Sequence, residues 1–136
     1  MNEKFIEICS YDGPGYRPQV DYGAWRVAIL NYNEAPEAIK MVERHNETDE
    51  VFVLTRGKGV LFVGDGAARP DSLVPQIMEI GKIYNVKKAI WHTTAMTKDA
   101  SMLIVENRDT TEANSDYSDL TAAEKALILD FAGREL

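Results

Sequence analysis

At residues 43–54 a charged, ionisable run leads straight into an apolar one, ERHNETDEVFVL. The apolar part is β-branched and aromatic, which is typical of a β-strand. Successive side chains of a strand alternate between its two faces, so Glu50, Phe52 and Leu54 share one face. If that face points into the molecule, Glu50 is a buried carboxylate, which must bind a cation, accept hydrogen bonds or hold a proton with a raised pKa.

Further short apolar runs lie on both sides of this one, separated by glycine-containing turns such as DGPG at residues 12–15 and RGKG at 56–59. Glycine supplies the positive φ that tight turns need. Several runs carry β-branched or aromatic residues on both faces, which favours sheets that are packed on both sides. The sequence therefore predicts a mainly β sandwich or barrel. The expected strands are residues 5–8, 25–30, 51–54, 60–63, 76–80, 83–86 and 102–105.

Two other segments complete the expected architecture. Residues 64–76, GDGAARPDSLVPQ, form a polar loop with two prolines, which we expect to fold over one end of a barrel as a structural element or a lid. A helix begins at a capping box formed by Thr121 and Glu124, and Gly133 is placed to stop it. The apolar stripe of this helix is expected to cover a barrel face or a dimer partner; it comprises Ala123, Ala126, Leu127 and Phe131.

Composition limits the class of protein. A chain of 136 residues with no shift in composition is expected to form one domain, residues 1–136. Its 45% hydrophobic and 27% charged residues exclude a disordered, collagen-like or disulfide-scaffold protein. The net charge of -7 argues against nucleic acid or an anionic membrane as partner. The single Cys9 and the lack of a long apolar run near the N-terminus predict a soluble, cytoplasmic protein.

The chain has only two histidines, His45 and His92. An isolated histidine is most often a hydrogen-bonded structural residue, but two near the ends of two expected strands favour a functional site. His92 follows Trp91 and lies close to Tyr84, whose rings suit either a pocket wall or ordinary core packing.

These residues resemble the motifs of the cupins. The first motif has two histidines one residue apart, then a glutamate, and a glycine seven positions after the glutamate. Here His45, Glu50 and Gly57 match it, and a carboxylate, Glu43, stands at the first histidine position. The second motif, a glycine followed eleven positions later by a histidine, resembles the stretch from Gly81 to His92. The resemblance implies a double-stranded β-helix, the jelly-roll barrel of the cupins, followed by the C-terminal helix.

The resemblance also implies a metal site. Two histidines cannot complete the usual three-histidine site of the family, but Glu43, His45, Glu50 and His92 could form a variant that holds a divalent metal ion with open positions for substrate oxygens.

Within the cupins, the chain is more closely similar to the ureidoglycolate lyase family, over roughly residues 43–107. The similar stretches are ERH at residues 43–45, the strand that begins at Val51, and the segment from Tyr84 to His92. Glu50 stands where that family usually has a glutamine, and Thr93 where it tends to have a second histidine.

This closer resemblance implies an enzyme of allantoin degradation that cleaves ureidoglycolate to glyoxylate and urea, and a homodimer. The catalytic acid and base are expected among His45, Glu50 and His92, since the reaction removes a hydroxyl proton and protonates the leaving nitrogen. The expected substrate-binding residues are Arg44, Lys88, Trp91 and Tyr84. Two alternatives stay open: another cupin enzyme acting on a sugar or hydroxy acid, and a non-catalytic binding cupin.

Overall fold

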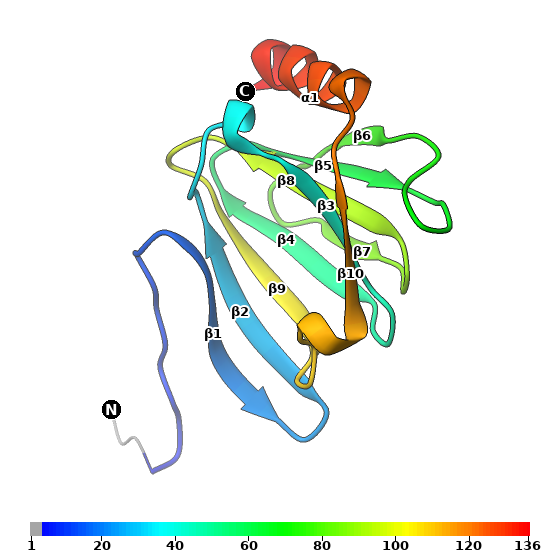
Figure 1. Ribbon diagram of the computed structural model, residues 1–136. Helices are drawn as coiled ribbons and strands as arrows, with labels where there is room; N and C mark the ends of the chain where they lie inside the picture. Colours follow the sequence, from blue (N-terminus) through cyan, green and yellow to red (C-terminus); the bar gives the residue numbers. More distant parts are fainter. Residues whose placement is uncertain (1–3) are drawn as a thin grey trace.

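Two five-stranded antiparallel sheets face each other in the computed structural model, which describes residues 4–136 (Figure 1). The first sheet has the strand order β1 (Gly15–Tyr22), β2 (Trp25–Asn31), β9 (Ser101–Asn107), β4 (Glu50–Arg56) and β7 (Ile83–Val86). The second has the order β10 (Ser115–Asp119), β3 (Met41–His45), β8 (Trp91–Met96), β5 (Gly59–Gly64) and β6 (Val74–Ile77). The helices of the described chain are α1 (Ala122–Glu135) and two short 3-10 turns, η1 (Pro36–Ala38) and η2 (Glu112–Asn114).

The space between the sheets holds the main hydrophobic core. Phe52 and Leu54 of β4 are buried there beside Glu50, so the shared face predicted from alternation is confirmed. Alternate residues of the neighbouring strand β9, Met102 and Ile104, pack on the same cluster. These side chains form one continuous hydrophobic cluster between the sheets.

The outer face of the second sheet is covered by α1, which lies against it at the top of Figure 1. Val60, Phe62 and Ala95 form a second buried cluster with Ile128 of the helix. The capping box is confirmed, because Glu124 N–H donates to Thr121 Oγ1 at 3.1 Å and Thr121 N–H donates to Glu124 Oε1 at 2.8 Å.

The expected helical stripe is confirmed in part, because Leu127 and Phe131 pack against the second cluster. The buried positions of α1 are Glu124, Ile128 and Ala132, whereas Ala123 and Ala126 are exposed. The buried side is the one on which Ile128 packs against the second sheet, and on the same side Arg69 donates to Glu124 Oε1 at 2.9 Å. The helix also continues through the predicted stop at Gly133, since that glycine does not adopt a positive φ.

The loop between β5 and β6 is fastened to the rest of the chain. In addition to the Arg69 contact with the helix, Asp71 N–H donates to Asp65 O at 2.8 Å. No residue of this loop lines the large cavity described below. Of the two roles expected for it, the structure favours the structural one.

Most expected strands are confirmed, and the differences have physical causes. The strand expected at residues 76–80 lies earlier in the chain, as β6 (Val74–Ile77). Residues 5–8 form no strand, because no described strand lies beyond the β1 edge to pair with them. Four further strands were not predicted, because polar side chains or, in β1, Pro18 interrupt their apolar pattern; these are β1, β3, β8 and β10. No helix within residues 4–136 has the length and hydropathy needed to cross a membrane.

Candidate metal centre and cavity

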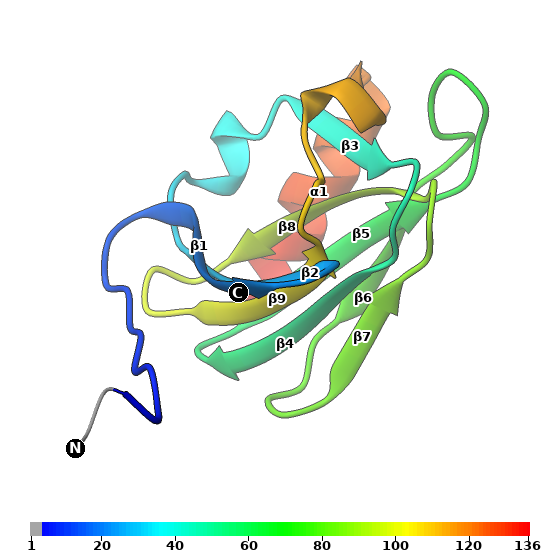
Figure 2. The same ribbon diagram turned by 90° about the horizontal axis from the view of Figure 1, so that it is seen from below.

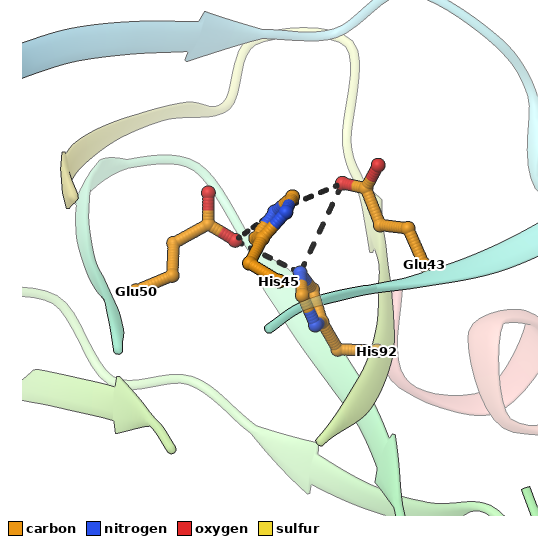
Figure 3. Close-up of side chains that lie close together, drawn as sticks. All are labelled: Glu43, His45, Glu50 and His92. Atoms are coloured by element: carbon orange, nitrogen blue, oxygen red, sulfur yellow. Dashed lines mark ion pairs between the residues drawn. The ribbon is translucent and has the colours of Figure 1, made fainter. Parts of the chain in front are cut away.

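Four ionisable side chains converge between the two sheets. Glu43 and His45 come from β3, His92 from β8 and Glu50 from the start of β4. Glu43 pairs with His92 across the β3–β8 ladder, while Glu50 reaches them from the facing sheet. Residues 43 and 45 point the same way because they are two positions apart on one strand. Figure 3 shows all four side chains directed toward one another.

The interatomic distances describe a compact cluster. His92 Nε2 lies 2.8 Å from Glu50 Oε1, and His45 Nε2 lies 3.4 Å from the same oxygen. Glu43 Oε1 is 3.8 Å from His45 Nε2 and 3.9 Å from His92 Nε2. One donor atom from each of the four residues lies within 4.8 Å of the others. The structure therefore brings together all four residues predicted as metal ligands, including the three predicted as catalytic.

The outer nitrogen of each imidazole is held by a neighbour. His92 Nδ1–H donates to the Ile90 carbonyl at 3.0 Å, and His45 Nδ1 lies 2.8 Å from Ser115 Oγ. A carbonyl oxygen can only accept, so neutral His92 carries its hydrogen on Nδ1 and presents the Nε2 lone pair to the cluster. This is the arrangement found around histidines that ligate metals.

Two atoms at the centre of the cluster have no hydrogen-bond partner. Glu50 Oε1 and His92 Nε2 are both buried, and although they are close, they are not aligned as donor and acceptor. Buried polar atoms without partners are costly, and a cation between them would satisfy both. Two imidazoles and two carboxylates suit a divalent transition metal. The residues present thus fit a metal ion.

Electrostatics within the metal-free cluster favour an ion pair. Burial opposes ionisation of Glu50, but the imidazoles of His45 and His92, whose Nε2 atoms lie close to its Oε1, outweigh it, so the pKa of Glu50 lies well below its usual range. Burial likewise opposes protonation of both histidines, yet Glu50 raises the pKa of each above its ordinary value. Of the three states expected for Glu50, this direction of the pKa favours the ionised carboxylate beside the two histidines over a carboxyl group that keeps its proton.

A second polar group, absent from the sequence prediction, adjoins the cluster. Glu106 Oε1 accepts from Arg26 Nη2 at 2.9 Å and from the Tyr16 hydroxyl, and Arg26 Nε–H donates to the Tyr16 oxygen at 2.9 Å. Glu106 Oε2 is buried without a partner, 4.0 Å from His45 Nε2. Burial and the charge of Glu50 raise the pKa of Glu106. The available signal was alternation on β9, which places residue 106 on the same inward face as Met102 and Ile104.

The cluster lies in a cavity of about 810 Å³ between the sheets. Tyr16, Arg26 and Glu106 line one side of it, and Thr94 and Tyr117 belong to the facing sheet. Other polar groups in its lining are Glu34, Lys40, Thr110, Thr111 and Glu112. The cavity can therefore accept a ligand that carries several hydroxyl or charged groups.

Two of the residues expected to bind substrate point away from this cavity. Arg44 lies over the Trp91 ring, 4.5 Å from its centre, and pairs with Asp116 at 2.9 Å. Arg44 and Trp91 each precede a cluster histidine by one position on a strand, and alternation sends them to the opposite face. Their roles are structural here, since Arg44 and Trp91 both donate to the Gly66 carbonyl.

The other two residues expected to bind substrate also do not reach the cavity. Tyr84 packs against the core, and its hydroxyl accepts from Glu79 N–H at 2.8 Å. Lys88 is exposed in the turn after β7, where its backbone N–H donates to Asp49 Oδ1. The structure thus leaves Arg44, Trp91, Tyr84 and Lys88 outside the cavity lining.

No protein-family model and no curated protein sequence matches the chain. Among solved structures, Streptomyces Pac13, a nucleoside dehydratase, is similar at 10% identity over 82% of this chain and 85% of that chain, with a TM-score of 0.55. A cupin-2 domain protein from Shewanella frigidimarina shares 19% identity over 72% of this chain and 85% of its own, with a TM-score of 0.50.

HppE, solved with cobalt and substrate, matches at 15% identity over 76% of this chain and 59% of its own, with a TM-score of 0.53. At these identities the similarities show the fold alone. They confirm the jelly-roll fold of the cupins that the two motifs predicted.

Proposed function

We propose that this chain, which has the cupin fold, is a small-molecule enzyme that uses a divalent metal ion held by Glu43, His45, Glu50 and His92. The observation that carries the proposal is the convergence of four ligand atoms at the wall of a large cavity. Two of these four atoms are buried and have no hydrogen-bond partner. The HppE structures, which are described with cobalt and with iron, support a metal in this fold.

In the proposed reaction, a bound metal supplies Lewis-acid polarisation of a substrate oxygen. Glu106 is then the carboxylate left to move protons, because its Oε2 has no partner and lies beside the cluster. Arg26 and Tyr16 hold its other oxygen and fix the direction of Oε2. The role is that of a general base positioned by two neighbours.

The finer proposal is cleavage of ureidoglycolate to glyoxylate and urea. Glu106 Oε2 takes the hydroxyl proton, the carbon–oxygen double bond of glyoxylate forms as the carbon–nitrogen bond breaks, and the proton passes to the leaving urea nitrogen. No water or redox partner is consumed. If the same cleavage proceeds without a metal, protonated His45 is the acid that protonates the leaving nitrogen. Glu50 and His92 then complete the acid–base group predicted from the sequence.

The test is release of glyoxylate from ureidoglycolate, together with the metal content of the purified protein. We expect turnover that is lost on chelation, restored by one divalent metal, and abolished in His92→Ala. Glu47→Gln, which changes an exposed acid near the cluster, is the matched control and should retain activity. Absence of turnover with every metal would eliminate the ureidoglycolate reaction, and turnover unaffected by chelation would eliminate the metal.

The size of the cavity favours a second candidate, an enzyme acting on a larger hydroxylated substrate such as a sugar, a larger hydroxy acid or a nucleoside. A volume of about 810 Å³ falls in the range of pockets that hold ligands well above the size of ureidoglycolate. Pac13, described with a similar fold as a nucleoside dehydratase and solved with uridine, supports a dehydration of this kind.

Thermal-shift screening of the metal-loaded protein against sugars, hydroxy acids and nucleosides tests this second candidate. Stabilisation by one class, followed by its turnover, would favour it over ureidoglycolate. Binding without turnover, weakened but not abolished by His92→Ala, would instead indicate a non-catalytic binding cupin.

A further inference from the structure

Strand β10 forms one edge of the second sheet, beside the strand that supplies two of the four candidate metal ligands. In Figure 1 it runs along β3. The ladder between the two strands pairs Ser115 with His45 and Tyr117 with Glu43. Residues directly opposite each other on an antiparallel pair point to the same face of the sheet. Ser115 and Tyr117, which we call the hydroxyl pair, therefore point into the cavity, and both belong to its lining.

The hydroxyl pair and Glu106 line opposite walls of the cavity. Figure 2 shows the two sheets as separate layers, with β3 of the second sheet set apart from β2 and β9 of the first. Glu106 lies on β9, whereas Ser115 and Tyr117 lie on the second sheet. A ligand at the metal centre thus has the proposed general base on one side and two hydroxyl groups on the other.

The Ser115 hydroxyl has a hydrogen to donate to such a ligand. Its oxygen lies 2.8 Å from His45 Nδ1, and Ser115 is buried. When His45 binds a metal through Nε2, its hydrogen is on Nδ1, so the serine oxygen accepts that hydrogen. The serine then keeps its own hydrogen for another partner, and within residues 4–136 its hydroxyl contacts no other hydrogen-bonding group. That hydrogen can therefore be donated to a ligand in the cavity.

Tyr117 supplies the second donor. It is 45% exposed and lines the cavity, so its ring lies at the mouth. Its hydroxyl has no hydrogen-bond partner in the described part of the chain. A phenol hydroxyl can donate as well as accept. The hydroxyl pair thus offers two neutral donors to a ligand with two acceptor oxygens.

The cations near the cavity are less suited to this role. Arg44 and Lys88, predicted from the sequence to bind substrate, lie outside the lining. Arg26 belongs to the lining, but its guanidinium already donates to two side chains and two backbone carbonyls. Lys40 is exposed before the start of β3, where water solvates its charge. The hydroxyl pair, which adjoins two of the candidate ligands, is better placed to bind substrate oxygens.

We propose that Ser115 and Tyr117 bind the substrate, each donating a hydrogen bond to one oxygen of a molecule held at the metal centre. The inference rests on the proposed function, because it needs a metal-bound molecule. It adds a substrate class, which is a small molecule with two acceptor oxygens close to the metal-bound atom, as in a hydroxy acid.

The test measures the binding of glycolate to the cobalt-loaded chain by isothermal titration calorimetry. Glycolate is the hydroxy-acid part of ureidoglycolate and has no ureido group to lose, so no turnover interferes. We expect its dissociation constant to rise about threefold to tenfold for Tyr117→Phe and for Ser115→Ala, since each removes one hydrogen bond. Ser115→Thr keeps a hydroxyl and should bind glycolate nearly as well as the unchanged chain.

Ser118→Ala is the matched control, because Ser118 lies on the same strand, faces the opposite side and is outside the cavity lining. It should leave glycolate binding unchanged. The affinity of each variant for cobalt alone is measured separately. Ser115→Ala should also weaken cobalt binding, since His45 loses its acceptor, whereas Tyr117→Phe should not.

The outcomes separate this inference from the proposed function. Cobalt binding with a glycolate affinity that neither variant changes would overturn the hydroxyl pair and leave the metal centre standing. A loss of glycolate affinity confined to Lys40→Met would overturn the pair in favour of that cation. A cobalt-loaded chain that binds no glycolate would overturn the pair too. A chain that binds no cobalt would overturn the metal centre and the pair with it.

Discussion

Glu50 links the two sheets of the site, because its carboxylate comes from the first sheet and the two imidazoles it contacts come from the second. A carboxylate with a lowered pKa between histidines with raised pKa values stabilises the folded chain only while both partners are charged. The stability of the metal-free protein should therefore depend on pH in both directions.

The pKa of Glu50 in the folded chain is below the ordinary value of 4.5. Its contribution to the unfolding free energy is therefore present above pH 4.5 and is lost as the pH falls through the folded pKa. For His45 and His92 the folded pKa is above 6.5, so their contribution is present below pH 6.5 and is lost as the pH rises through the folded pKa. Chemical denaturation of chelator-treated protein should thus give a maximum of unfolding free energy between these limits. Glu50→Gln should flatten both slopes, and slopes that the variant leaves unchanged would contradict the ion pair.

Gly57 is required in the turn between β4 and β5. It adopts a φ of +72°, and a Cβ at this position would lie 2.5 Å from Ala100 Cα. Gly57→Ala should therefore lower the unfolding free energy by more than the ~1 kcal/mol that left-handed backbone strain alone costs. Gly81→Ala is the matched control, because Gly81 has a φ of +85° and no atom within 4 Å of the added Cβ. Equal losses for the two variants in urea denaturation would mean that the contact with Ala100 relaxes freely.

At the scale of elements, the start of α1 shows how far a local pattern reaches. The spacing of Thr121 and Glu124 was sufficient to locate the first turn, because the capping box involves only neighbouring residues. The side of the helix that is buried was not predictable in the same way, because Ile128 packs on residues of the second sheet that are far away in sequence.

Thr121→Ala should lower the unfolding free energy by about 1 kcal/mol, since it leaves Glu124 N–H without its side-chain acceptor. Thr121→Ser keeps the hydroxyl and should restore most of the stability. Thermal or urea denaturation measures both, and a Ser variant as unstable as the Ala variant would show that the methyl group, not the cap, matters.

Strands β3 and β8 carry the site but were missed by the sequence reading. Each mixes polar residues that face the cavity with apolar residues such as Val42 and Trp91 that face the helix cluster. Sequence patterns find strands by apolar runs, so a strand that supplies a polar site gives a weak signal. The motif spacing located His45 and His92 where the strand pattern did not.

At the scale of the whole molecule, the second sheet is packed between two clusters, one inside the sandwich and one under α1. Ile128 is central to the outer cluster, with only 1% of its surface exposed. Ile128→Ala should lower the unfolding free energy by about 2–5 kcal/mol.

Leu129→Ala is the matched control, because Leu129 is the next residue on the helix and is 40% exposed. Leu129→Ala should lower the unfolding free energy, measured by urea denaturation, by much less than Ile128→Ala does. A similar loss for both variants would contradict the expectation that the burial of Ile128 against the second sheet stabilises the chain more than the exposed Leu129 does.

Alternation and capping, which act over a few residues, were sufficient to predict the mainly β fold and the capped C-terminal helix. The resemblance to the cupin motifs predicted the four residues of the candidate metal centre. Only the tertiary structure decided that Glu106, Arg26 and Tyr16 join that centre, since they come from strands far apart along the chain. It also decided that α1 covers the outer face of the second sheet. Those outcomes depend on which strands lie side by side, and no local pattern encodes that order.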